Sequence, residues 1–193
     1  IHMQPSLIQL ITEARKNNRA IGHFNVSNLD AIHAIVSAAE ELNVPVILGV
    51  TEGEQDYIGT EIIASIVKSL KQTAKVPVFL NADHHYSFES VKKAIDAGFD
   101  MAIIDMVKVP LEENITITKQ CVDYAREISE KTGREILIEA ELGFIGQSSK
   151  MLDTIPDGVG AETMTTVEDA QAFIDATGID LLAPSVGNIH GMV

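Results

Sequence analysis

The sequence predicts an α/β fold, a TIM-type (β/α)8 barrel of which this chain covers about the first six βα units. Short runs rich in β-branched residues alternate with longer segments in which apolar residues recur at the 3.6-residue period of a helix, and this alternation indicates βαβ units and a parallel sheet. Polar residues also gather at the carboxyl ends of six consecutive expected strands. A barrel builds its site from many strand ends, whereas a doubly wound open sheet concentrates its site at one switch point. The alternation of strands and helices alone does not exclude an open sheet. It is the polar residues at the strand ends that favour the barrel.

The expected elements follow one another with turn residues between them. Residues 43–45 (Asn-Val-Pro), Gly98, Gly133 and Gly178 each fall where a helix should end before the next strand begins. No G-x-G-x-x-G follows the first strand, which argues against dinucleotide binding. In chain order we expect a strand at 20–26 (AIGHFNV), a helix at 29–42, a strand at 46–51, a helix at 60–73, a strand at 76–82, a helix at 88–97, a strand at 101–105, a helix at 112–131, a strand at 135–141, a loop at 143–163, a helix at 167–176 and a strand at 181–186.

Composition limits the class of protein. The 193 residues, 46% of them hydrophobic, suffice for one domain with a real core, so we expect a single, incomplete barrel domain over 1–193 with residues 1–2 as a cloning scar. A formal net charge of −14 argues against nucleic acid as a partner. No apolar run approaches the roughly 20 residues of a membrane span, so no membrane partner is expected. Cys121 has no second cysteine for an internal disulfide, which favours a reducing, cytoplasmic location.

The stretch NADHHYS, residues 81–87, places one carboxylate and two imidazoles at the end of the third expected strand. One interpretation is a polar turn in which Asp83 or Ser87 caps the next helix. The other is a metal ligand beside a general acid/base. His84 and His190 belong to different strand ends, and no His-Glu-x-x-His motif or cysteine pair gives a local zinc spacing. These residues by themselves leave both interpretations open.

The fifth expected strand carries two carboxylates on one face. Side chains alternate along a strand, so Leu137, Glu139 and Glu141 share one face. Carboxylates that point into a barrel are costly unless they are paired, hydrogen-bonded or near a cation. Few basic residues lie at the strand ends, so a nearby cation is an economical explanation, and buried pairing with Arg or Lys is the competing one.

The stretch VGNIHGMV, residues 186–193, follows the last expected strand. Gly187 and Gly191 would let the backbone approach a ligand closely. Backbone N–H groups there could hold a phosphate while His190 holds a metal. Glycines after a strand also commonly form only a turn, so this motif alone is weak.

Five stretches occur in order along the chain: GHFNVSNLDAIHAIVSAAEELNVPVILGVTEGEQDYIG, NADHHYSFESVKKAIDAGFD, IID…PLEENITITK, IEAELGFIG and VGNIHG. Together they resemble the class II, zinc-dependent fructose-/tagatose-bisphosphate aldolase family, in the same order and spacing. The resemblance covers essentially the whole chain, and five ordered motifs are far more specific than any one of them.

The resemblance implies a role for each matching residue. His84 and His190 match zinc ligands, and Asp83 matches the acid/base that handles the proton on the substrate C4 oxygen. Asp105 and Glu141 match carboxylates that take the zinc in an alternative, substrate-free position. The other implied contacts are Gly187 and Gly191 in the loop at the phosphate of dihydroxyacetone phosphate, where a monovalent cation (Na+ or K+) is often bound, and Asn25 and Thr51 on the pocket floor.

The implied activity is reversible cleavage of a ketose 1,6-bisphosphate, fructose or tagatose, to dihydroxyacetone phosphate and glyceraldehyde 3-phosphate by a homo-oligomer, a dimer or a tetramer. The alternative is a non-catalytic or altered-activity relative that keeps the fold. The family's third zinc ligand lies on a strand that would follow Val193, and such a barrel needs about 250 residues, so we expect a fragment of a longer enzyme.

Residues 146–149 (GQSS) lack the acid that many relatives carry there, and Met106-Val107 stands where small residues are common. His23 and His85 are expected to be supporting residues.

Overall fold

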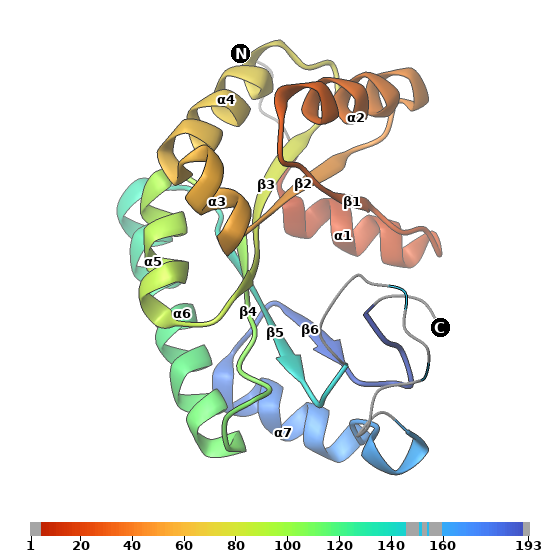
Figure 1. The fold of residues 1–193 in the computed structure, drawn as a ribbon, viewed down its shortest axis with the longest axis vertical. Coiled ribbons are helices and arrows are strands. Elements are labelled where there is room, and N and C mark those ends of the chain that lie inside the picture. The colour runs from red at the N-terminus through yellow and green to blue at the C-terminus, as the bar shows by residue number, and fades with distance from the viewer. Residues whose placement is uncertain (1–4, 146–150, 152–153, 155–159, 191–193) are drawn as a thin grey trace.

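Six parallel strands form a half-barrel in the computed structural model, which describes residues 5–145, 151, 154 and 160–190 (Figure 1). The strands lie in the order in which they occur along the chain, each paired with its sequence neighbours. A doubly wound sheet would reverse this order at a switch point, so the predicted barrel arrangement is confirmed for about six of its eight units. The strands are β1 (Gly22–Asn25), β2 (Val46–Thr51), β3 (Val78–His85), β4 (Met101–Ile104), β5 (Leu137–Leu142) and β6 (Leu181–Pro184).

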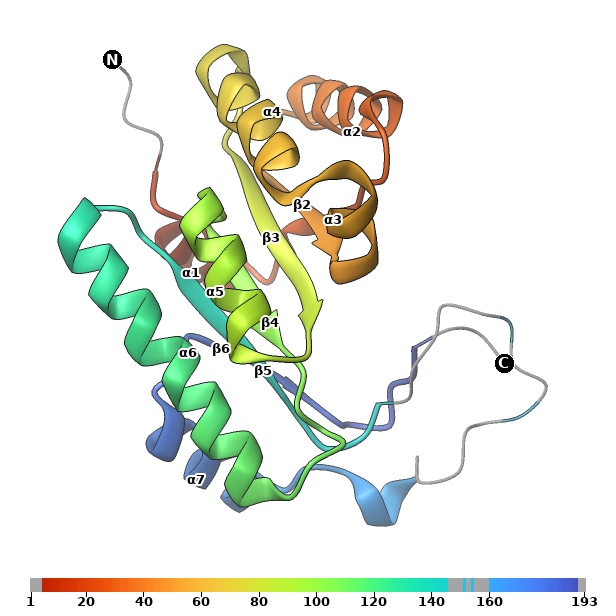
Figure 2. The ribbon, with the colours of Figure 1, turned by 60° about the vertical axis from the view of Figure 1, so that its left-hand side comes forward.

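Helices connect successive strands and cover the outer face of the sheet (Figure 2). The predicted helices at 29–42, 60–73 and 88–97 have the expected bounds. The helix expected at 112–131 is one residue longer at each end, and the helix expected at 167–176 is one residue longer at its C-terminal end. Among the described residues, no helix is long and apolar enough to span a bilayer. The helices are α1 (Leu7–Lys16), α2 (Leu29–Leu42), α3 (Glu52–Ile58), α4 (Thr60–Thr73), α5 (Phe88–Ala97), α6 (Leu111–Thr132) and α7 (Val167–Thr177), with a 3-10 turn, η1, at Ala161–Thr163.

Local capping chemistry explains the helix bounds. The Ser87 side chain accepts a hydrogen bond from the Ser90 N–H, so the expected capping role falls to Ser87 rather than to Asp83. Helices α5, α6 and α7 end at Gly98, Gly133 and Gly178, each in the left-handed conformation that glycine adopts without a steric penalty.

Two apolar clusters hold the half-barrel together. The larger one lies between the sheet and the outer helices, and the smaller one lies inside the curve of the strands. Helix α1 packs against the inner cluster, in which Leu7 is buried together with Phe79 and Leu137. Burial of a leucine side chain stabilises a fold by about 1.5–3 kcal/mol. The N–H groups of Leu7 and Ile8 donate to Glu135 at 2.6 and 3.3 Å, which fixes the start of this helix.

Three expectations need correction. Helices α1 and α3 form where the sequence analysis expected none. Strand β3 continues through His85 instead of stopping at residue 82, so the acidic and imidazole residues lie within the strand and not in the turn after it. η1 forms inside the expected loop 143–163.

Candidate metal centre and active site

A cavity of about 750 Å³ opens at the carboxyl ends of the strands. Its lining includes Asn25 of β1, Thr51 of β2, Asp83 and His84 of β3 and Glu139 of β5. On the regular strands the lining residues are the ones that alternation turns inward. Polar residues predicted at the carboxyl ends of the strands therefore line a common cavity.

The backbone at His84 departs from regular strand geometry. His84 has a φ of +46°, in the left-handed region, and the pairing of β3 with β4 shifts register between Ala82 and His85. In a regular strand Asp83 and His84 would point to opposite faces, but with this irregularity both line the cavity. A non-glycine residue held in that region costs about 1–3 kcal/mol, and such strain is found chiefly at functional sites.

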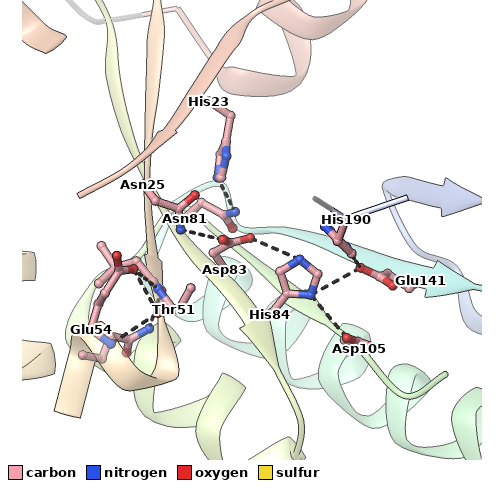
Figure 3. Close-up of polar contacts among 12 residues, drawn as sticks. His23, Asn25, Thr51, Glu54, Asn81, Asp83, His84, Asp105, Glu141 and His190 are labelled. Atoms are coloured by element: carbon pink, nitrogen blue, oxygen red, sulfur yellow. Dashed lines mark hydrogen bonds and ion pairs between the residues drawn. The ribbon is translucent and has the colours of Figure 1, made fainter. Parts of the chain in front are cut away.

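Three side chains converge as a metal ligand set. One ligand atom from each of His84, Glu141 and His190 lies within 4.8 Å of the other two (Figure 3). The rings of His84 and His190 are 4.9 Å apart between centroids, in an edge-to-face arrangement. His190 Nε2 is buried, makes no hydrogen bond and lies 3.8 Å from Glu141 Oε1. An imidazole nitrogen buried in this way, beside a second imidazole and a carboxylate, fits a bound cation.

Asp105 joins this cluster from the end of β4. Its Oδ2 lies 3.2 Å from His84 Nδ1, and Glu141 Oε1 lies 3.3 Å from the same nitrogen. The hydrogen bond to Asp105 raises the pKa of His84 to about 9. Burial, and then the charge of Asp105, raise the pKa of Glu141 to about 7. The His84 shift reflects a carboxylate hydrogen-bonded to its ring, and the Glu141 shift reflects burial and then a neighbouring carboxylate, so a cation or protons must compensate the negative charge here.

The competing explanation, buried pairing with Arg or Lys, finds no partner among the described residues that line this cavity. Among the described residues that line it, none is Lys or Arg. Glu139 also faces the cavity, and burial raises its pKa to about 7. Within the described part of the lining, several carboxylates therefore share one cavity in which histidines are the only cationic candidates, and this supports the cation explanation.

Asp83 is oriented by β1. The Asn25 Nδ2 donates to Asp83 Oδ2 at 2.7 Å, and Asp83 Oδ1 lies 3.9 Å from His84 Nε2 (Figure 3). The Asp83 side chain is only 10% exposed. One carboxylate oxygen is thus held in place, while the other faces the histidine side of the cavity.

The remaining predicted site residues lie around this centre. Thr51 lines the cavity, but its hydroxyl donates to Glu54 at 2.9 Å as part of the cap of α3. Gly187 has a φ of +87°, and an added Cβ would lie 2.8 Å from Met164 Cε, so this turn requires glycine. Gly191 and the loop residues 146–149 lie outside the described residues. Met106, which stands where small residues are common in the family, is buried in the outer core and is not among the residues that line the cavity.

Two polar pairs that sequence reasoning did not find support the cavity wall. The Nε2 atom of Gln55 lies 2.7 Å from the Nε2 atom of His85, and both side chains are buried. Asn81 contacts His23 Nε2 at 2.9 Å. The Gln55 contact was missed because α3 was missed, although Thr51-x-x-Glu54 is a capping box that predicts a helix start at that point. Nothing in the local pattern indicates the second pair, since it depends on which strands become neighbours.

Comparison with known proteins identifies the family. The model of the fructose-bisphosphate aldolase class-II family matches residues 5–193. The chain belongs to the class II fructose-bisphosphate aldolase family. It is 40% identical over 189 residues to the fructose-bisphosphate aldolase of Geobacillus stearothermophilus and 38% identical to that of Staphylococcus aureus (strain N315), and each alignment covers 96% of the chain and 62% of the relative.

Solved aldolase structures share the fold. The crystal structure of a putative fructose-1,6-biphosphate aldolase from Coccidioides immitis superposes with a TM-score of 0.79 at 34% identity, covering 96% of this chain and 62% of that one. The YdjI aldolase from Escherichia coli K12 superposes with a TM-score of 0.78 at 30% identity, covering 97% and 64%. This aldolase-family chain spans about 62% of the length of the curated relatives.

Proposed function

We propose that the protein is a zinc-dependent ketose-bisphosphate aldolase, a carbon–carbon lyase. The convergence of His84, Glu141 and His190 beside Asp83, in a chain of this family, is the observation that carries the proposal. Because the chain spans about 62% of its curated relatives, the activity of the whole protein is inferred and not observed.

The proposed zinc ligands are His84 and His190, with Glu141 and Asp105 as the carboxylates that take the metal in an alternative position. The donor set supports zinc, which binds imidazole nitrogen and carboxylate oxygen. Zinc held there supplies Lewis acidity, which stabilises the negative charge that develops on the substrate oxygens when the bond breaks.

Asp83 is proposed to move the proton. In the cleavage direction its carboxylate accepts the proton of the substrate C4 hydroxyl while the C3–C4 bond breaks, and in the condensation direction it returns that proton. The hydrogen bond from Asn25 holds one oxygen at 2.7 Å and leaves the other toward the cavity. Orientation by Asn25 therefore favours one geometry for proton transfer.

The proposed substrate is fructose or tagatose 1,6-bisphosphate, which differ only in configuration at C4. The names of the curated relatives support fructose. The products are dihydroxyacetone phosphate and glyceraldehyde 3-phosphate. Backbone N–H groups near Gly187 and Gly191 are proposed to contact a phosphate together with Na+ or K+.

We further propose a single barrel domain in a homo-oligomer, a dimer or a tetramer. A cytoplasmic location remains a prediction.

The decisive experiment measures zinc and activity together. The full-length protein is assayed for zinc content and for cleavage of both bisphosphates, before chelation, after chelation and after zinc is returned. We expect about one zinc per chain and activity that the chelator removes and zinc restores. A protein that binds zinc but cleaves neither sugar would favour the alternative, a non-catalytic or altered-activity relative. The absence of an acid in residues 146–149 is the observation that favours this alternative.

A further inference from the structure

Helix α3 contacts the part of β3 that carries the proposed metal ligand. The Gln55 Nε2 lies 2.7 Å from His85 Nε2 and also donates to the Val50 carbonyl oxygen at 3.0 Å. Gln55 and His85 are 3% and 2% exposed. These contacts join the end of β2, the short helix and the end of β3 in one buried network.

The Val50 carbonyl determines the direction of the hydrogen bond to His85. A carbonyl oxygen only accepts, so the Gln55 amide must present its nitrogen to Val50 and to His85. His85 Nε2 is therefore the acceptor, and in the neutral ring the hydrogen lies on Nδ1. His85 Nδ1 is buried without a hydrogen bond and lies 3.7 Å from Glu52 Oε1. The His85 ring thus has a defined tautomer and orientation.

The residues after His84 are held on both sides. On the α3 side, Glu52 Oε1 accepts the Tyr86 N–H at 3.1 Å. On the β4 side, the His85 carbonyl oxygen accepts the Asp105 N–H at 2.8 Å. These contacts surround the one described residue of β3 whose φ is positive, His84.

We propose that Gln55 and His85 act as a positioning pair that keeps His84 in its left-handed conformation with its ring in the metal cluster. Neither residue reaches the cluster itself. The pair holds the backbone at His85, the residue after His84. If β3 continued as a regular strand here, the His84 ring would face away from the cavity. This inference rests on the proposed metal site, and it assigns to His85 a function that the Asp83-His84 motif alone does not.

The test separates ligand positioning from general stability. Gln55→Met has nearly the same volume and lacks both hydrogen bonds, and Gln55→Met/His85→Leu replaces the whole pair with apolar groups, which often restores stability. Val122→Ala, in the outer core on α6, is a destabilised control away from the site. The full-length protein and each variant are measured for zinc affinity by chelator competition and for the thermal midpoint without metal.

We expect Gln55→Met to weaken zinc binding about 10–100-fold, the usual effect of losing a residue that orients a ligand. The double variant should regain thermal stability but not zinc affinity. The control Val122→Ala should lose thermal stability but keep a zinc affinity within about twofold of wild type. Wild-type zinc affinity in Gln55→Met, or its recovery in the double variant, would overturn the positioning pair alone. Wild-type protein that takes up no zinc would overturn the proposed function and the positioning pair with it.

Discussion

The substitution Asp83→Asn isolates the proposed proton transfer from the rest of the site. Asp83 Oδ2 accepts from Asn25 at 2.7 Å, and its Oδ1 lies 3.9 Å from His84 Nε2. Asparagine has the same shape, and its side-chain oxygen can still accept from Asn25. Its amide group cannot take up a proton from the substrate. The variant therefore keeps the geometry and loses the acid/base function.

The expected magnitude follows from the role assigned to Asp83. A positioned acid/base contributes about 10²–10⁴-fold to turnover, which corresponds to about 2.7–5.4 kcal/mol at 1.36 kcal/mol per factor of ten. Stability should not fall, because the change removes one negative charge from a cavity that also contains Asp105 and Glu139. We expect turnover to drop at least about 100-fold while zinc content and the thermal midpoint of the metal-free protein are retained.

The assay couples release of dihydroxyacetone phosphate to NADH oxidation, with zinc measured on the same samples. Asp123→Asn is the matched control, because Asp123 is an exposed carboxylate on α6 that pairs with Lys119. It should leave turnover and zinc unchanged. Turnover within about threefold of wild type in Asp83→Asn would refute the acid/base role. Parallel loss of zinc would show that Asp83 acts on the metal instead.

Three further measurements test the fold and the site. In Gly49→Ala, the added Cβ would lie 2.5 Å from His23 Cε1, so urea unfolding should show a loss of about 1–3 kcal/mol, and an unchanged midpoint would contradict this. The raised pKa values, about 9 for His84 and about 7 for Glu141, add stability at low pH that is lost as pH rises through each value. The thermal midpoint of metal-free protein should therefore fall from about pH 5 to pH 9, and a rising midpoint would show the opposite linkage. Burial raises the pKa of Cys121 to about 12, so iodoacetamide should modify it only after unfolding, as mass spectrometry can check. Rapid modification of the native protein would disagree.

Much of the fold could be predicted because local chemistry sets it. The strand at 46–51 and three helices have the predicted bounds, since caps such as Ser87 and left-handed glycines such as Gly98 mark helix ends within a few residues of sequence. Helix α3 was missed because its seven residues are too few to show a helical period. Its capping box, Thr51-x-x-Glu54, nevertheless marks the helix start within four residues of sequence.

The candidate site was predictable only as far as strand alternation holds. Alternation correctly turned Glu139 and Glu141 inward on β5, and Glu141 lies with His84 and His190 in the structure. It could not place Asp83 and His84 in the same cavity, because adjacent strand residues point to opposite faces. Their common orientation depends on the irregular pairing of β3 with β4, which is a tertiary property.

The site departs twice from what stability alone would favour, and both departures fall at the same point. His84 is held in a conformation that disfavours its side chain, and Asp105 and Glu141 are buried next to each other with no Lys or Arg among the described residues lining the cavity. Natural sequences violate such local rules chiefly where function requires it. A cation between the histidines and the carboxylates would account for both at once, because it needs the His84 ring turned inward and it neutralises the carboxylates. A purely structural origin would have to explain each departure separately.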